Sequence, residues 1–510
     1  MKRRDFLKMT SALPVGLSMA GLAQKAYSAS PAYSNVSVTA PSVMPQVINI
    51  FMYGGASELA GNLTNISDIN MHSQNDYSAN NAFGARILRT EADADGGDDW
   101  EITANGFWRS AGGSHMEDML AADDMTVYRT IFKQENATRS HRESIFMSHK
   151  GTLDIENSPG IGSRLALMLL QNESSYANSA KLGDDQTFSS FDSLTLPFVS
   201  FEGDTQTYAL DPENTIPLQL RGITMDSNFN NPYSRSTLRS WEPSYDSESM
   251  IESLVTSRLQ QLASNRTQYS GAWDGFDKRA ELDERLSGLR DILDSGSAAG
   301  LGVAYPANNR FADQLEAAVT LALHNPETLY IALGTPGLGG WDDHNNGIDR
   351  YPDRMNDLME AIKAAMAHIK AAKNNITTIK GHNRAETDNI IINVFGDFGR
   401  LVNLNGSGGW DHANNQNLYT FGGAIVRPDN EAAKLGQVVG KTRRDGASKT
   451  NNQYTVPVVS AADPTWEPMA IASSIYQYFG ATNSHVLTAD PLIRTDGFGS
   501  LADGLPPLNT

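Results

Sequence analysis

The stretch from Asn389 to His412 decides the fold. It begins Asn-Ile-Ile-Ile-Asn-Val-Phe-Gly-Asp-Phe-Gly-Arg and ends Gly-Ser-Gly-Gly-Trp-Asp-His. The apolar run from Ile390 to Phe395 is typical of a strand that is buried on both faces of a parallel sheet. Asp397 and Arg400 follow this strand at once. Because open α/β sheets bind ligands just beyond the carboxyl ends of their strands, these polar residues are candidates for a functional site.

A second predicted strand, Thr328–Leu333, leads into a glycine-rich turn and then into Gly-Gly-Trp-Asp-Asp-His, which contains Asp342 and His344. Residues i and i+2 of an extended backbone point the same way, so this pair could close on one metal ion. The other Gly-Gly-Trp segment runs into Asp411 and His412. The alternative is two similar tight turns with tryptophans packed beneath them. The metal interpretation of these two segments takes Asp342, His344, Asp411 and His412 as candidate ligands, with Asp411 either a ligand or a residue that orients His412.

Two further turns carry candidate site residues. Strand Gln46–Met52 runs into Gly-Gly-Ala-Ser, which places Ser57 at a second sheet end that is expected to face the site; the alternative is a helix N-cap or turn residue. Before a predicted helix, the turn Arg139-Ser-His141 could place a cation and an imidazole near an anionic substrate. The alternative for this turn is a solvated loop with a capping serine.

The order of the predicted elements indicates the architecture. Helices and strands alternate from Phe311 to Phe395, which favours an α/β fold with a doubly wound, mostly parallel sheet and right-handed crossovers. We expect residues 30–510 to form a single domain, with a helical-hairpin insertion at about residues 245–296. A long helix is predicted over Tyr351–Lys373, and His368 lies off its apolar stripe, so we expect this side chain to be solvated.

The amino terminus resembles a targeting segment. Lys2-Arg-Arg-Asp-Phe-Leu-Lys8 is a twin-arginine pair, and a weakly apolar segment and small residues follow it. We therefore expect residues 1–29 to be a signal peptide that engages the twin-arginine translocase, and the protein to be periplasmic or secreted. The apolar stretch is short and interrupted, so no stable membrane span is expected.

Composition limits the partners and the metal ligands. The 510 residues carry a formal net charge of −19, and residues 1–29 contribute +4, so the remaining chain is near −23. Such a charge argues against nucleic acid and anionic lipid as partners. The chain has no cysteine. Any metal must therefore be held by His, Asp, Glu, Asn or hydroxyl groups, and zinc, calcium, magnesium and manganese are all candidates.

The chain carries, in order, the twin-arginine segment, Gly-Gly-x-Ser, Arg-Ser-His, Gly-Gly-Trp-Asp-x-His, Phe-Gly-Asp-Phe-Gly-Arg and Asn-Gly-x-Gly-Gly-x-Asp-His. Together they resemble the exported bacterial family called domain of unknown function 1501. The resemblance extends from about Gln46 to Phe479. That family looks like a branch of the alkaline phosphatase and sulfatase superfamily. The resemblance implies a doubly wound core, one or two divalent metals at strand ends, and a Ser, Thr or formylglycine nucleophile.

The same resemblance assigns roles to single residues. It makes Asp342 and His344 the first metal-ligand pair, Asp397 the start of a later pair, and His412 the closing ligand. Ser57 is the nearest match to the nucleophile. The cation that would bind an anionic ester is Arg400 or Arg139.

Some positions depart from the superfamily pattern. Phe398 stands where a ligating histidine is expected, and Glu58 is an offset substitute for an acidic ligand at the end of the first strand. The spacing of Asp342 and His344 is also shorter than the superfamily pattern. A two-metal site is therefore incomplete, which leaves one metal or none.

Two functions follow from these observations. The first is a periplasmic metal-dependent hydrolase of phosphate or sulfate esters, with an anionic ester small molecule or glycan as substrate and Ser57 or an activated water as nucleophile. The second is a catalytically degenerate binding or assembly protein of the cell envelope, since a fold by itself does not establish an activity.

Overall fold

The structure is a computed structural model. It describes residues 33–65, 102–133, 136–184, 186–230, 254, 257–258, 270–427, 434–444, 456–458 and 465–488. The expected signal peptide and most of the first helix of the expected insertion lie outside the described residues. The second helix of the insertion is present as α8 (Ser270–Asp294).

The described part of the chain contains an eight-stranded sheet of order β10-β2-β9-β6-β1-β5-β3-β4. Its strands are β1 (Gln46–Met52), β2 (Met125–Phe132), β3 (Phe198–Ser200), β4 (Ile223–Thr224), β5 (Tyr330–Leu333), β6 (Ile390–Gly396), β9 (Asn415–Gly422) and β10 (Gln437–Val439). β9 is antiparallel to both of its neighbours, while the other pairs are parallel. The expected α/β fold with a mostly parallel sheet is therefore confirmed.

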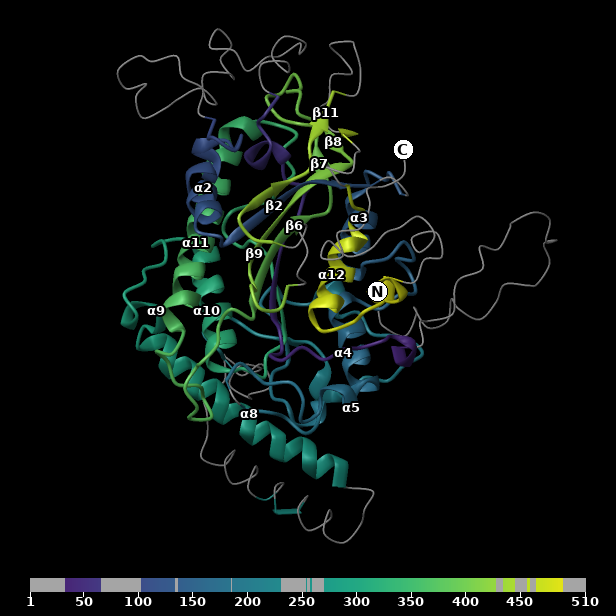
Figure 1. The fold of residues 1–510 in the computed structure, drawn as a ribbon, viewed down its shortest axis with the longest axis vertical. Helices are drawn as coiled ribbons and strands as arrows, with labels where there is room; N and C mark the ends of the chain where they lie inside the picture. Colours follow the sequence, from purple (N-terminus) through teal and green to yellow (C-terminus); the bar gives the residue numbers. More distant parts are fainter. Residues whose placement is uncertain are drawn as a thin grey trace, which may run out of the picture.

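Helices cover both faces of this sheet (Figure 1). One face carries α2 (Ser114–Ala121), α10 (Arg310–His324) and α11 (Gly347–Ala372), and the other carries α3 (His141–Lys150), α4 (Ile161–Gln171) and α12 (Met469–Tyr478). Alternate side chains of β1 supply the two cores: Ile48 and Ile50 pack on the first side, Val47 and Phe51 on the second. The short elements are α5 (Glu173–Tyr176), α9 (Ser297–Gly300), β7 (Gly399–Arg400), β8 (His412–Ala413), β11 (Thr442–Arg443) and β12 (Val456–Pro457).

A row of buried polar side chains fixes the register of the central strands. The Asn393 amide donates to Asn49 Oδ1 at 2.9 Å, and the Thr420 hydroxyl donates to Asn393 Oδ1 at 2.9 Å. The Asn49 amide donates in turn to the Tyr330 hydroxyl at 2.7 Å. Each bond contributes about 0.5–1.5 kcal/mol, but a slipped register would leave several buried groups without partners. The row therefore selects one alignment of β9, β6, β1 and β5.

The strand directions bring five chain segments to one edge of the sheet. The carboxyl ends of β1, β2, β5 and β6 lie there because these strands run the same way. The amino end of the antiparallel strand β9 lies at the same edge, directly after β8. This edge is near the top of Figure 1, where β7 and β8 are labelled. The segments that leave and enter the sheet here carry the residues discussed below.

The expectation that His368 is solvated is wrong. Its side chain on α11 is 0 % exposed. Its Nε2 lies 3.2 Å from the Ser297 hydroxyl and its Nδ1 lies 3.2 Å from the Tyr305 hydroxyl. The helix is therefore covered on more than its apolar stripe, because α9 and the following loop supply polar partners.

A second buried histidine should make the fold sensitive to acid. His149 on α3 packs its ring 4.2 Å from that of Phe51, and burial lowers the pKa of the imidazole to about 3. The unfolded chain takes up a proton at this residue near pH 6.5 and the native protein does not, so stability falls as the pH drops from about 6.5 towards 3. Between pH 6.5 and 5 the expected loss is about 2 kcal/mol. Urea unfolding at pH 6.5 and 5 measures this loss. Between the two pH values, the free energy of unfolding of His149→Phe should fall by about 2 kcal/mol less than that of wild type.

The matched control for this prediction is His382→Phe, because the His382 side chain is exposed. It should leave the pH dependence of unfolding unchanged. Equal pH dependence in wild type and His149→Phe would contradict the prediction.

Candidate metal centre

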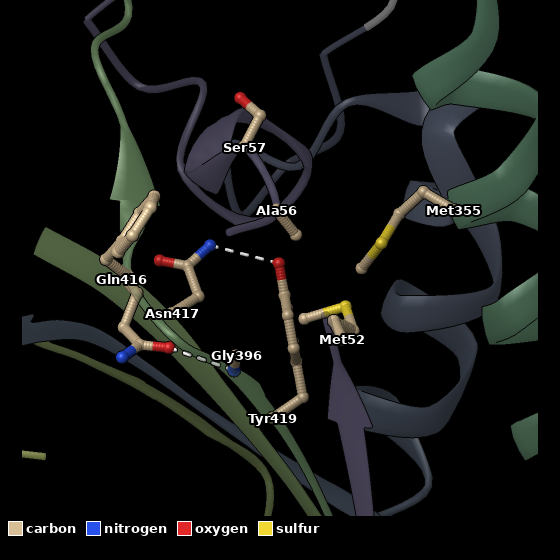
Figure 2. A pocket seen from close by; sticks show the side chains of 9 residues that line it. Met52, Ala56, Ser57, Met355, Gly396, Gln416, Asn417 and Tyr419 are labelled. Carbon is tan, nitrogen blue, oxygen red and sulfur yellow. Dashed lines mark hydrogen bonds between the residues drawn. The ribbon is translucent and has the colours of Figure 1, made fainter. Parts of the chain in front are cut away.

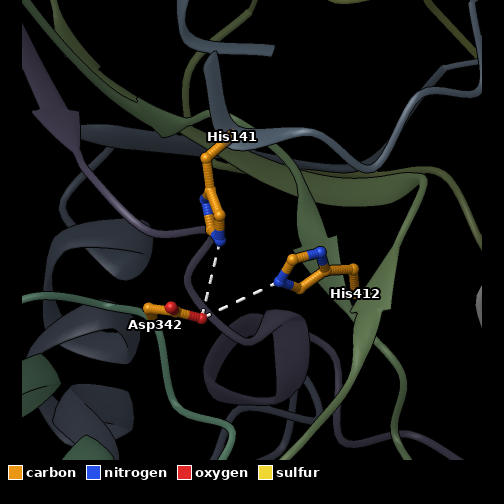
Figure 3. Close-up of side chains that lie close together, drawn as sticks. All are labelled: His141, Asp342 and His412. Atoms are coloured by element: carbon orange, nitrogen blue, oxygen red, sulfur yellow. Dashed lines mark ion pairs between the residues drawn. The ribbon is translucent and has the colours of Figure 1, made fainter. Parts of the chain in front are cut away.

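Three side chains from separate segments meet at the carboxyl edge of the sheet. His141 is the first residue of α3, Asp342 lies in the loop after β5, and His412 lies in β8. Each offers one ligand atom, and these atoms lie within 4.8 Å of one another. Figure 3 shows the two imidazoles pointing toward the Asp342 carboxylate. This group could hold a metal ion.

His344 adds a fourth ligand atom to the same place. Its Nε2 lies 2.8 Å from His412 Nε2 and 3.4 Å from Asp342 Oδ1. The Nε2 atoms of His141 and His412 lie 3.6 and 3.8 Å from the same Oδ1. Ligand atoms that surround a tetrahedral zinc ion at 2.0–2.1 Å are about 3.3 Å apart, so these separations are close to those of a coordination shell. Two unprotonated nitrogens 2.8 Å apart would repel, so the two Nε2 atoms must share either a proton or an ion.

The other ring nitrogen of each imidazole faces an oxygen acceptor. Nδ1 of His141 lies 2.7 Å from Asp397 Oδ2, and Nδ1 of His344 lies 3.2 Å from Asp411 Oδ1. Nδ1 of His412 lies 2.9 Å from the carbonyl oxygen of Arg139. Such contacts place the proton on Nδ1 and leave Nε2 free to bind a metal, as is usual for metal-binding histidines. The tautomers are assigned from these partners.

The Nε2 atom of His141 supports the same conclusion. It is buried and has no hydrogen-bond partner within the described residues. A buried polar atom without a partner requires an explanation, and an ion at the centre of this group would supply one.

The charges around the centre set the protonation states. The hydrogen bond to Asp397 raises the pKa of His141, while burial, followed by the nearby Arg400 charge, lowers the pKa of His412. Burial alone would raise the pKa of the Asp342 carboxyl, but the hydrogen bond and the charge of Arg400 outweigh it, and the net pKa is lowered. Asp342 is therefore ionised at neutral pH, as a metal ligand must be.

Arg400 holds this part of the site together. Its side chain is 0 % exposed, and Nε donates to the Gly55 carbonyl at 2.7 Å. The other guanidinium nitrogens donate to the Trp410 carbonyl at 2.9 Å, to Asp342 Oδ1 at 2.6 Å and to the Gly54 carbonyl. The prediction that Arg400 binds an anionic substrate does not agree with these contacts, because the guanidinium donates its hydrogen bonds to acceptors within the protein. Arg400 instead positions Asp342.

Asp397 and Asp411 were predicted as ligands, and the structure places both behind an imidazole. The Asp397 side chain is 0 % exposed, with Oδ2 on His141 and Oδ1 accepting from the backbone N–H of Gly54 at 3.2 Å. Asp411 is 58 % exposed and contacts His344. Both carboxylates therefore orient histidines of the group that could hold a metal, and the sequence had left this role open for Asp411.

Ser57 lies at the start of a short helix. It is 3 % exposed, and its hydroxyl accepts from the backbone N–H of Leu59 as the N-cap of η2 (Glu58–Gly61). Figure 2 shows the Ser57 hydroxyl pointing away from Tyr419 in a cavity that is also lined by Phe398. Glu58 is fully buried, and burial raises the pKa of its carboxyl. The capping alternative for Ser57 agrees with this geometry, and the nucleophile interpretation has no support from it.

Close packing explains the glycine pair after β1. A side chain on Gly54 would place its Cβ 2.4 Å from the backbone nitrogen of Asp342, and Gly54 has φ +116°. The turn after β1 therefore lies against the loop that presents Asp342. Trp341, which is 0 % exposed, donates its backbone N–H to the Tyr53 carbonyl at 2.9 Å and fixes the same contact.

The sequence identified His141 as a substrate-side residue and missed its place in the group that could hold a metal ion. A signal was available, because β2 was predicted and the turn with His141 follows it just as Asp342 follows β5. Arg139 has an exposed side chain beside this centre, and its carbonyl oxygen holds His412. The sequence predicted a role for the Arg139 side chain as a cation and did not predict the contact of its backbone carbonyl with His412.

A scan against protein-family models gives no match for this chain, and a search of curated proteins gives none either. The resemblance to domain of unknown function 1501 therefore stays a prediction. Within the described residues, none of the helices combines the length and the apolar character that a membrane span requires.

Proposed function

We infer that this chain is a metal-dependent hydrolase of phosphate or sulfate esters with an alkaline phosphatase-like core. One observation carries the proposal. The Nε2 atoms of His141, His344 and His412 lie 3.4–3.8 Å from Asp342 Oδ1, and the four residues come from three separate segments at one edge of the sheet. A site at the carboxyl edge of a mostly parallel sheet is also where enzymes of this architecture bind their ligands.

The ligand set suits a divalent transition metal. Three imidazoles and one carboxylate favour zinc or manganese over calcium and magnesium, which prefer oxygen ligands. When bound, such an ion would polarise an ester oxygen and activate water. Asp342 is held in place by Arg400, and His141 by Asp397. The exposed Arg139 guanidinium is the group available to meet an anionic ester.

The nucleophile in this proposal is water. The Ser57 hydroxyl is buried and accepts a hydrogen bond from the backbone N–H of Leu59, so it lacks access to a substrate in solvent. The same observation favours the second candidate, a degenerate binding or assembly protein of the cell envelope. Such a protein would retain the side chains that bind the metal and would lack a serine that can act as a nucleophile.

The location is part of the proposal. The twin-arginine pair of residues 3–4 supports export through the twin-arginine translocase to the periplasm. That route carries folded proteins, so a metal could be bound before export.

Hydrolysis of chromogenic esters tests the function. The purified protein is stripped with a chelator, reloaded separately with zinc, manganese, magnesium or calcium, and assayed with nitrophenyl phosphate and nitrophenyl sulfate. We expect turnover of at least one ester with zinc or manganese and none after chelation. His412→Ala should be inactive, and His382→Ala should match wild type because His382 is exposed and outside the centre. Metal loading without turnover of either ester would overturn the hydrolase proposal in favour of the binding protein.

A further inference from the structure

We propose that Lys133 is a positioning residue of the metal centre, which holds the imidazoles of His141 and His412 in place through its buried ammonium group. The proposal rests on the metal centre of the proposed function. Lys133 is the first residue after β2, and its backbone N–H donates to the Asn414 carbonyl at 3.0 Å. It is therefore anchored beside the strand that follows His412.

The ammonium group holds the chain on both sides of His141. Nζ donates to the Thr138 carbonyl at 2.5 Å and to the Ser144 hydroxyl at 2.7 Å. Thr138 lies three residues before His141, in the turn that enters α3, and Ser144 lies three residues after it, on the first turn of the helix. One ammonium group thus contacts both the turn before His141 and the first turn of the helix that His141 begins.

The same ammonium group also lies over the ring of Phe398, with Nζ 5.1 Å from the ring centroid. The Phe398 ring packs against two of the ligands, with its centroid 4.7 Å from that of His141 and 4.4 Å from that of His412. A cation over an aromatic face is attracted to the ring, so Lys133 holds Phe398 against the two imidazoles. Removing the ammonium would free the ring and the turn together.

Burial makes this arrangement depend on Lys133. The residue is 1 % exposed, so it cannot reach a substrate in solvent and must act through its neighbours. Burial lowers the pKa of the ammonium to about 8, which still leaves it mostly charged at neutral pH. Two hydrogen bonds and an aromatic face then satisfy a charge that would otherwise be costly to bury.

Lys133→Met tests the proposal, because it keeps the length of the side chain and removes the charge and its donors. Lys150→Met is the matched control, since Lys150 is also buried, lies on α3 and donates from Nζ to a carbonyl, that of Ile155. The first readout is the Nδ1 proton signal of His141 in the metal-free protein, by NMR with labelled histidine. The His324 Nδ1 proton, which faces the Thr377 carbonyl at 2.8 Å, reports whether the fold is intact. The second readout is Co²⁺ affinity and the visible spectrum of the Co²⁺ protein.

We expect Lys133→Met to shift or lose the His141 signal, keep the His324 signal, weaken Co²⁺ binding by about 10- to 100-fold and change the Co²⁺ spectrum. Lys150→Met should match wild type. An unchanged His141 signal and Co²⁺ affinity in Lys133→Met would overturn the proposal.

If Lys133→Met also loses the His324 signal, Ser144→Ala decides, because it removes one Nζ partner. Ser144→Ala should shift the His141 signal in the same direction, and no shift would overturn the proposal. If the wild-type protein binds no Co²⁺, the metal centre fails, while the His141 signal still decides the role of Lys133.

Discussion

Replacing His141 by alanine is expected to weaken binding of zinc or manganese by about 100- to 1,000-fold. Four-ligand zinc sites contribute about 10–16 kcal/mol, so each ligand is worth about 2.5–4 kcal/mol. His141 is one of three histidines whose Nε2 atoms lie within 3.8 Å of Asp342 Oδ1, and its Nε2 is buried without a hydrogen-bond partner within the described residues. Competition with a metal-sensitive dye measures the affinity of the purified protein.

Two variants serve as comparisons for His141→Ala. Asp397→Asn should retain an acceptor for His141 but lose the charge behind it, so we expect an intermediate loss of about 10- to 100-fold. His382→Ala should bind metal as wild type does, because that side chain is exposed and outside the group. Wild-type affinity in His141→Ala would remove this residue from the coordination shell.

Replacing Arg400 by glutamine is expected to damage both the fold and the metal centre. The substitution leaves the carbonyls of Gly54, Gly55 and Trp410 without their buried donor. Each unsatisfied acceptor costs about 1–3 kcal/mol, and partial rehydration lowers the sum, so we expect about 3–5 kcal/mol less stability. The ion pair with Asp342 adds little to this figure because Asp342 is 51 % exposed. Metal affinity should fall by about 10- to 100-fold, since Asp342 loses the group that orients it.

Urea unfolding of the metal-free protein and dye competition measure these two effects of Arg400→Gln. Arg142→Gln is the surface control, because Arg142 is 60 % exposed and pairs with the exposed Glu156. It should change stability by less than about 1 kcal/mol. Arg400→Lys should recover only part of the loss, since a single ammonium cannot reproduce the planar fork. Stability and metal affinity at wild-type levels in Arg400→Gln would show that Arg400 does not position Asp342.

The parts of the fold that the sequence predicted are those with strong local patterns. The apolar run of β6 reads as a buried strand, and the structure places it between β9 and β1 with every residue buried. The alternation of helices and strands indicated the parallel sheet, and with it the edge where Asp342, His344 and His412 meet. Those three residues were predicted together because each follows a glycine-rich turn near a strand end.

The roles that the sequence could not predict depend on partners from distant segments. Arg400 has the local pattern of a substrate-binding cation, but three carbonyls from two other segments occupy its donors. Asp397 follows a strand end as a metal ligand would, but its carboxylate contacts the imidazole of His141, which is 256 residues away in the chain. His368 was expected in solvent because the covering groups, Ser297 and Tyr305, come from outside its helix. Helical periodicity describes one face of a helix and cannot show what a later loop will cover.

The central claim is that His141, Asp342, His344 and His412 surround one metal ion. Anomalous diffraction from crystals soaked in zinc or manganese tests it most directly. We predict one strong anomalous peak at the carboxyl edge of the sheet, about 2.0–2.2 Å from the Nε2 atoms of the histidines and from Asp342 Oδ1. A protein that shows no peak at this place, or a peak bound by other residues while these four side chains stay as they are, would contradict the account.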